Sequence, residues 1–91
     1  MLLPVYGDPG LIEDIDQLNQ QKIDGVLLLR GSLVPTGNTL RDLVTALTSQ
    51  VRAVLLTEER FHQYKDYCER GDLLGLLLTS IEDGCRYDVR S

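Results

Sequence analysis

The segment Asp24-Gly25-Val26-Leu27-Leu28-Leu29-Arg30-Gly31-Ser32-Leu33-Val34-Pro35-Thr36-Gly37-Asn38-Thr39 gives the clearest indication of the fold class of this chain. Residues 26–29 are four apolar side chains in a row. A strand with one face in water would alternate instead, so this run predicts a strand buried on both faces. Glycine and proline then break the chain. A helical stripe follows, made of Leu40, Leu43, Val44 and Leu47. A buried strand, a loop and an amphipathic helix in this order indicate an α/β fold.

The same alternation of strand and helix continues on both sides of this segment. Helix starts are marked by side chains that can cap the first turn, at Asp8, Thr39 and Thr57. Gly71 is a typical residue for a helix stop. The expected elements are strand 1–6, helix 9–22, strand 23–29, helix 40–50, strand 51–56 and helix 58–70.

Residues 73–78, with the sequence Leu-Leu-Gly-Leu-Leu-Leu, are apolar over their whole length. Such a run fits a buried strand or a short buried helix, and periodicity does not separate the two. Gly75 and the preceding alternation favour a strand. Residues 82–84 then predict a turn, and residues 86–91 a loose tail or an edge strand. We therefore predict a single three-layer α/β domain over residues 1–91, with a mostly parallel four-stranded sheet and helices on its faces in the order βαβαβαβ.

The charge balance and the cysteine content argue against several classes of function. The 14 acidic residues outnumber the 9 basic ones and give a net charge of −5. Phosphate backbones repel such a chain, so direct nucleic-acid binding is not expected. No apolar run reaches the roughly 18–20 residues of a membrane span, and the first residues lack the pattern of a signal peptide. Two cysteines without a Cys-x-x-Cys motif favour reduced thiols. Together these features predict a cytoplasmic protein without a membrane partner.

A site for a small anion is one interpretation of the loop that follows the buried strand. In a parallel sheet, the loops that begin at residues 6, 30 and 57 would lie together at the carboxyl edge, where ligands bind. Hydroxyls, backbone amides freed by glycine and a guanidinium suit a phosphate, a nucleotide or a carboxylate. The candidate ligand residues are Arg30, Ser32, Thr36, Asn38 and Thr39. The glycine spacing matches neither a P-loop nor a Gly-x-Gly-x-x-Gly motif. The alternative is a loop that only turns the chain and caps the helix.

Two thiols are the other candidate groups. Cys68 is expected near the C-terminal end of its helix beside Glu69, where the helix dipole and the carboxylate oppose a thiolate, with Arg70 as the compensating charge. Cys85 follows the turn and is expected to be the more exposed thiol. Each cysteine is either a reactive thiol or a structural one. A single histidine, His62, supports neither a metal site nor a general base. The sequence predicts no catalytic set, no metal and no cofactor.

The order of elements resembles that of the DsrE/DsrF/DsrH-like family of small α/β proteins, which includes TusB-like subunits of the sulfur relay used in tRNA thiolation. The matching segments are Met1-Leu2-Leu3, Val26-Leu27-Leu28-Leu29, Val51–Leu56 and Arg70-Gly71. This chain departs from the family at Cys68, which does not lie where the sulfur-carrying cysteine would, and it lacks the aromatic tail of TusB-like members. The resemblance implies a subunit that forms complexes and carries no sulfur itself.

Two further families share parts of the pattern. Residues 24–57 resemble a DRTGG-type regulatory domain, most clearly in Val54-Leu55-Leu56-Thr57-Glu58. The rotary-ATPase F subunit is similar at Gly7-Asp8-Pro9 and at residues 55–58, but the segment that follows its acidic helix start is missing here. Because three families with different functions fit the chain comparably, their likeness indicates a fold and supports a function by analogy alone.

Three functions follow as hypotheses. The first is a non-enzymatic subunit that acts through protein–protein assembly, as a homo- or hetero-oligomer, in a setting like the sulfur relay. A core this thin gains from a partner that adds buried surface. The second is a regulatory domain that senses a small anion or nucleotide at residues 30–39. The third is a thiol-based carrier or enzyme that uses Cys68 or Cys85. We expect the first.

Overall fold

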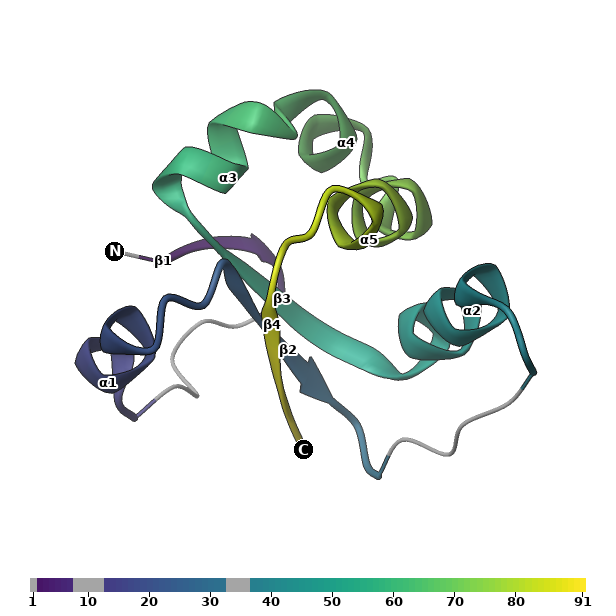
Figure 1. The fold of residues 1–91 in the computed structure, drawn as a ribbon, viewed down its shortest axis with the longest axis horizontal. Coiled ribbons are helices and arrows are strands. Elements are labelled where there is room, and N and C mark those ends of the chain that lie inside the picture. The colour runs from purple at the N-terminus through teal and green to yellow at the C-terminus, as the bar shows by residue number, and fades with distance from the viewer. Residues whose placement is uncertain (1, 8–12, 33–36) are drawn as a thin grey trace.

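A computed structural model describes residues 2–7, 13–32 and 37–91 (Figure 1). Strands and helices alternate along the chain until three helices follow one another before the last strand. In chain order the elements are β1 (Leu2–Tyr6), α1 (Ile15–Gln20), β2 (Gly25–Leu29), α2 (Leu40–Gln50), β3 (Val51–Thr57), α3 (Glu58–Gln63), α4 (Lys65–Arg70), α5 (Leu73–Glu82) and β4 (Tyr87–Arg90). None of the helices in these ranges combines the length and the apolar character needed to cross a membrane.

Within the described residues, the sheet has the strand order β1-β3-β2-β4. β3 runs antiparallel to both of its neighbours, β1 and β2, and β2 pairs in parallel with β4. The chain is therefore a mixed α/β domain. The predicted mostly parallel sheet is wrong.

The connection between β2 and β3 explains this difference. A parallel crossover needs a connection that returns across the sheet to the end where the first strand began. Here α2 instead ends beside the end of β2. Leu29 pairs with Val51, and the N–H of Arg30 donates a hydrogen bond to the carbonyl of Gln50 at 2.8 Å. The chain leaves the sheet and returns to the same end, so β3 pairs antiparallel with β2.

Residues 73–78 form the first part of α5, so the strand predicted there is wrong. Asp72 caps this helix, because its Oδ1 accepts a hydrogen bond from the N–H of Gly75 at 2.9 Å. The buried residues of α5 are Leu76, Leu77 and Ser80. Ser80 lies three positions after Leu77 and four after Leu76, so all three side chains lie on one side of the helix. The edge strand predicted as one option for residues 86–91 is confirmed as β4.

The hydrophobic core is divided between the two faces of the sheet, and β2 contributes to both parts. Every residue of β2 is buried, which confirms that residues 26–29 are buried on both faces. Helices α2 to α5 lie over one face and α1 over the other (Figure 1). The first cluster is Leu27, Leu29, Val44, Leu47, Val51, Val54, Leu56, Tyr64, Leu76, Leu77 and Cys85. The second cluster is Leu2, Leu18, Val26, Leu28, Ala53 and Leu55.

Most of the predicted helix ends agree with the structure. The hydroxyls of Thr39 and Thr57 each accept a hydrogen bond from the N–H three residues further on, at 3.1 and 3.3 Å, so both predicted caps are confirmed. Gly71 follows α4 with a positive φ of 68°, which confirms the predicted stop. The predicted cap Asp8 lies outside the described residues. α1 begins later than predicted, after Asp14, which caps it.

Candidate functional site

The three loops that were predicted to meet at one edge of the sheet do not meet. Because β3 runs antiparallel to β1 and β2, Thr57 lies at the opposite end of the sheet from Tyr6 and Leu29. Leu29 pairs with Val51 at the start of β3, and Tyr6 with Val54 in its middle. Thr57, the last residue of β3, pairs with Leu2 at the start of β1. The N–H of Thr57 also donates to the carbonyl of Asp24 at 2.9 Å. The loops after Tyr6 and Leu29 therefore begin on one side of the sheet, and the loop after Thr57 begins at the opposite end of the strands.

The candidate anion-binding residues lie in exposed positions of the loop between β2 and α2. Arg30, Ser32, Asn38 and Thr39 are exposed, and Thr36 lies outside the described residues. The hydroxyl of Thr39 accepts the hydrogen bond that caps α2. That oxygen is therefore already part of the local structure of the helix.

The first turn of α2 places a carboxylate against this loop. A Cβ atom at Gly37 would lie 2.8 Å from Oδ2 of Asp42. An open depression beside the Asp42 carboxylate is lined by Gly37, Asp42, Thr45, Ala46 and Ser49. The hydroxyls of Thr45 and Ser49 donate to helix carbonyls, each at 2.8 Å. An anion bound here would lie next to a negative charge, which disfavours it. The anion hypothesis stays a prediction.

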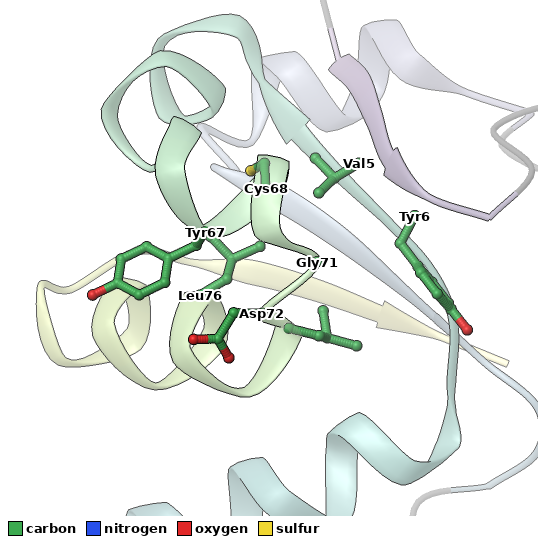
Figure 2. Close-up of a pocket in the computed structure, with 8 residues that line it drawn as sticks. Val5, Tyr6, Tyr67, Cys68, Gly71, Asp72 and Leu76 are labelled. Carbon is green, nitrogen blue, oxygen red and sulfur yellow. The ribbon is translucent and has the colours of Figure 1, made fainter.

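A small cavity lies between β1 and the junction of α4 with α5, and Cys68 lines it (Figure 2). The pairing register of β1 shifts between Pro4 and Tyr6, and a bulge of this kind re-aims side chains. Both Val5 and Tyr6 line the cavity as a result. The full lining is Val5, Tyr6, Tyr67, Cys68, Gly71, Asp72, Leu73 and Leu76. Its volume of ≈ 30 Å³ suits a water molecule, whereas metabolites and cofactors occupy pockets of roughly 300–1,000 Å³.

The surroundings of Cys68 oppose a reactive thiolate. Burial raises the pKa of the Cys68 thiol, and the carboxylate of Glu69 adds to the increase. Arg70, the predicted compensating charge, lies over the ring of Tyr67 at 5.1 Å, and its Nη2 lies 3.9 Å from Oδ2 of Asp72. Since the thiolate is the nucleophilic form of cysteine, a raised pKa lowers the reactivity of this residue. The thiol-carrier hypothesis stays a prediction.

A group of polar contacts centres on Asp24, the residue before β2, at the end of the sheet where β3 ends at Thr57. Its Oδ1 accepts a hydrogen bond from Nε of Arg60 at 2.9 Å, and its Oδ2 accepts one from the N–H of Arg86 at 2.8 Å. Burial alone would raise the pKa of Asp24. The two hydrogen bonds and the charges of both arginines outweigh that effect, so the pKa of Asp24 lies below its usual value. Asp24 therefore joins β2 to α3 and to the start of β4.

The same network continues from Arg60 to Cys85. Nη1 of Arg60 donates to Oε1 of Gln63 at 2.7 Å, and the Gln63 amide donates to the hydroxyl of Tyr64 at 3.3 Å. That hydroxyl donates to Asp83 at 2.8 Å and lies 3.7 Å from Sγ of Cys85. Burial raises the pKa of Tyr64, and the hydrogen bond to Asp83 raises it further.

The exposure of the two cysteines is the reverse of the predicted order. Cys85 is buried and Cys68 is only partly buried, so the prediction that Cys85 is the more exposed thiol is wrong.

Sequence reasoning missed this network, because its members are far apart in the chain. Asp24 is 36 residues from Arg60 and 62 residues from Arg86. The strand order β3-β2-β4 brings the three segments together. The charged residues next to Asp24 in the sequence do not indicate this strand order.

In the part of the chain that the structure describes, no three His, Cys, Asp or Glu side chains are placed to hold a metal ion.

The strand β4 is held firmly at its first residue. A Cβ atom at Gly25 would lie 2.6 Å from the ring of Tyr87, so the ring packs directly on the backbone of β2. The hydroxyl of Tyr87 lies 2.8 Å from Oγ of Ser80, which is fully buried. Burial raises the pKa of Tyr87 to about 12. These contacts fix the start of β4 to both β2 and α5.

The rest of β4 presents an open edge. Among the described residues no strand pairs with its outer side. Val89 lies opposite Leu27 and is 46% exposed. Asp88 and Arg90 point to the opposite face of the sheet from Val89, because side chains alternate along a strand. Nε of Arg90 donates to Oδ2 of Asp88 at 2.7 Å. The edge therefore combines an exposed apolar side chain with a pair of opposite charges.

Comparison with known proteins adds no relative to this picture. No protein-family model, no curated protein and no solved structure matches the chain.

Proposed function

We propose that this chain is a non-catalytic subunit that works by assembling with another protein chain. The observation that carries the proposal is the open edge of β4, where Val89 is 46% exposed in a strand of the sheet. An edge strand offers backbone N–H and C=O groups that can pair with a strand of a second chain. The protein would act by extending its sheet into a neighbour.

Other exposed apolar side chains support a role in assembly. Tyr6, the last residue of β1, is 46% exposed, and Leu40 and Leu43 at the start of α2 are 37% and 36% exposed. Single exposed apolar residues are ordinary on protein surfaces, so these three add to the open edge of β4 and do not replace it. A domain of this length also buries a smaller fraction of its surface than a larger one, and a partner adds buried area.

The resemblance to sulfur-relay subunits suggests a narrower form of this proposal, in which the chain joins a complex without carrying sulfur. Carrier thiols are usually activated by nearby cations or by a helix N-terminus. The raised pKa of Cys68 supports a non-carrier role, and so does the burial of Cys85 in the core. In such a complex, this chain would hold its neighbours in position while sulfur passes through their cysteines.

Photo-crosslinking in cells that produce the chain tests the assembly proposal. A benzophenone amino acid replaces Val89 in one variant and Asp66, an exposed residue of α4, in the matched control. We expect a discrete adduct from position 89, identified by mass spectrometry, and none from position 66. Adducts that are absent from both positions, or equally abundant at both, would contradict the proposal.

A further inference from the structure

We propose that the partner of β4 is β4 of a second copy of this chain, paired antiparallel about a two-fold axis at Val89. This inference rests on the proposed assembly function and names its partner. The two four-stranded sheets would join into one continuous sheet. The self-complementary charges of β4 carry the inference.

The strand is ordered before any partner binds. Tyr87–Arg90 pairs with β2 along its whole length. At its start, the N–H of Asp24 donates to the carbonyl of Arg86 at 2.8 Å, and the N–H of Arg86 donates to the Asp24 carboxylate at 2.8 Å. The hydroxyl of Tyr87 lies 2.8 Å from Oγ of Ser80. A strand fixed in this way loses little conformational freedom when a second strand docks on it.

The sequence of β4 is complementary to itself in one antiparallel register. When Val89 lies opposite Val89 of the second copy, Asp88 of each chain lies opposite Arg90 of the other. Opposite charges that face each other across two strands stabilise the pairing, and like charges destabilise it. Registers centred on Asp88 or on Arg90 would place two like charges opposite each other. The charges of β4 therefore select the register centred on Val89.

The surroundings of these side chains suit the same register. The side chains of Asp88 and Arg90 are 31% and 36% exposed and already form an ion pair. In the dimer, two aspartates and two arginines would alternate in one group on the face that carries α1. Partial burial makes such pairs stronger than fully exposed ones. On the other face, the two Val89 side chains would cover each other.

The opposite edge of the sheet does not offer a second site of this kind. Pro4 lies in the middle of β1 and has no N–H to donate, and the register of β1 shifts directly after it. Proline and bulges are devices that blunt an edge strand. Pairing of β4 with β1 of a further copy would build an open filament. Because β1 is blunted, pairing of β4 with itself closes a dimer.

Sedimentation equilibrium of the full chain tests the dimer and its register. We expect the wild-type chain to reach twice the 10.2 kDa mass of one chain at high concentration and to dissociate on dilution. Asp88→Arg would place Arg opposite Arg90, and Arg90→Asp would place Asp opposite Asp88. Each variant should weaken the dimer about tenfold or more. Asp66→Arg makes the same charge change on α4 and should dimerise like the wild type.

Mixing the two single variants gives the decisive measurement. Asp88→Arg carries two positive charges on β4 and Arg90→Asp carries two negative ones, so a mixed pair has opposite charges at both positions. We expect the 1:1 mixture to form a dimer more tightly than either variant does alone. The double variant Asp88→Arg/Arg90→Asp restores opposite charges within and between chains, and it should also dimerise. Circular dichroism checks that each variant is folded.

The results separate this inference from the proposed function. A wild-type chain that stays monomeric, a dimer that both single variants keep, or a mixture that stays monomeric would each overturn the β4 dimer. A crosslinked adduct at position 89 whose mass differs from two chains would also overturn it, yet would leave the assembly function standing. Adducts missing from position 89 altogether would overturn the assembly function itself.

Discussion

Oδ1 of Asp24 lies 2.9 Å from Nε of Arg60, and this ion pair joins the start of β2 to α3. The second carboxylate oxygen accepts a hydrogen bond from the N–H of Arg86, just before β4. The side chains of Asp24 and Arg60 are 21% and 28% exposed. Such partly buried charged contacts contribute more to stability than fully exposed ones. One carboxylate thereby connects three segments of the chain that are distant in sequence.

Asp24→Asn should destabilise the protein. The amide keeps one acceptor oxygen and lacks the charge, so at least one of the two hydrogen bonds is lost. We expect the free energy of unfolding to fall by about 1–3 kcal/mol. Urea unfolding followed by circular dichroism measures this as a lower midpoint at constant slope. Asp66→Asn makes the same change at an exposed position of α4 and should stay within about 0.5 kcal/mol of the wild type. Equal losses in the two variants would contradict a specific role for Asp24.

The contribution of Asp24 should depend on pH. The pKa of Asp24 in the folded chain lies below its ordinary value of 3.8, so near that pH the folded chain binds fewer protons than the unfolded one. The free energy of unfolding then rises with pH. The contribution is complete above the ordinary pKa and is lost as the pH falls through the lower pKa of the folded chain.

We therefore expect the stability difference between wild type and Asp24→Asn to be constant from about pH 7 to pH 5 and to shrink below about pH 4. Urea unfolding of both proteins over this range measures the difference. A difference that stays the same below about pH 3 would show that the charge of Asp24 is not what stabilises the fold.

The local elements could be predicted from the sequence, but the direction of β3 could not. The apolar run at residues 26–29 and the caps at Thr39 and Thr57 depend on neighbouring residues, and all agree with the structure. The direction of β3 depends on where α2 ends relative to β2, which alternation of strand and helix leaves open. For residues 73–78, the sequence contains a residue that indicates a helix. Asp72 is a typical N-cap, and it favours the helix that the structure contains.

The candidate site was less predictable than the fold, because it depends on that strand order. The expected meeting of three loops required a parallel sheet and fails with β3 reversed. The contact of Asp24 with Arg60 arises from the same reversal, since Thr57 then ends β3 beside the start of β2. The charged pair in β4 was visible in the sequence as Asp88 and Arg90. The role proposed for this pair could not be predicted, because it depends on β4 being an open edge strand.

Tyr87→Phe should reveal the contact between β4 and α5. At neutral pH the variant loses the contact with Oγ of Ser80, at 2.8 Å in the wild type. We expect a loss of about 0.5–1.5 kcal/mol in the free energy of unfolding. Tyr6→Phe, at the exposed end of β1, is the matched control and should stay within about 0.5 kcal/mol of the wild type.

The contribution of Tyr87 to the free energy of unfolding should decrease at alkaline pH. Burial raises the pKa of Tyr87 from 10.0 to about 12. A raised pKa gives stability that is complete below the ordinary value and is lost as the pH rises through the folded value. The advantage of the wild type over Tyr87→Phe should therefore shrink above about pH 10, as the unfolded chain ionises first. Unfolding measured at intervals up to about pH 11.5 checks this trend, and an advantage that grows with pH would contradict it.

Thiol labelling should show two slow cysteines. Burial raises the pKa of the half-buried Cys68, and Cys85 is only 8% exposed. We expect both to react with a disulfide reagent at about pH 7 more slowly than free cysteine, and Cys85 more slowly than Cys68. Cys68→Ala and Cys85→Ala isolate each thiol, and the chain unfolded in urea supplies the unprotected rate for both. Fast labelling of the folded chain at about pH 6 would indicate a stabilised thiolate, and it would favour the thiol-carrier hypothesis over a non-carrier subunit.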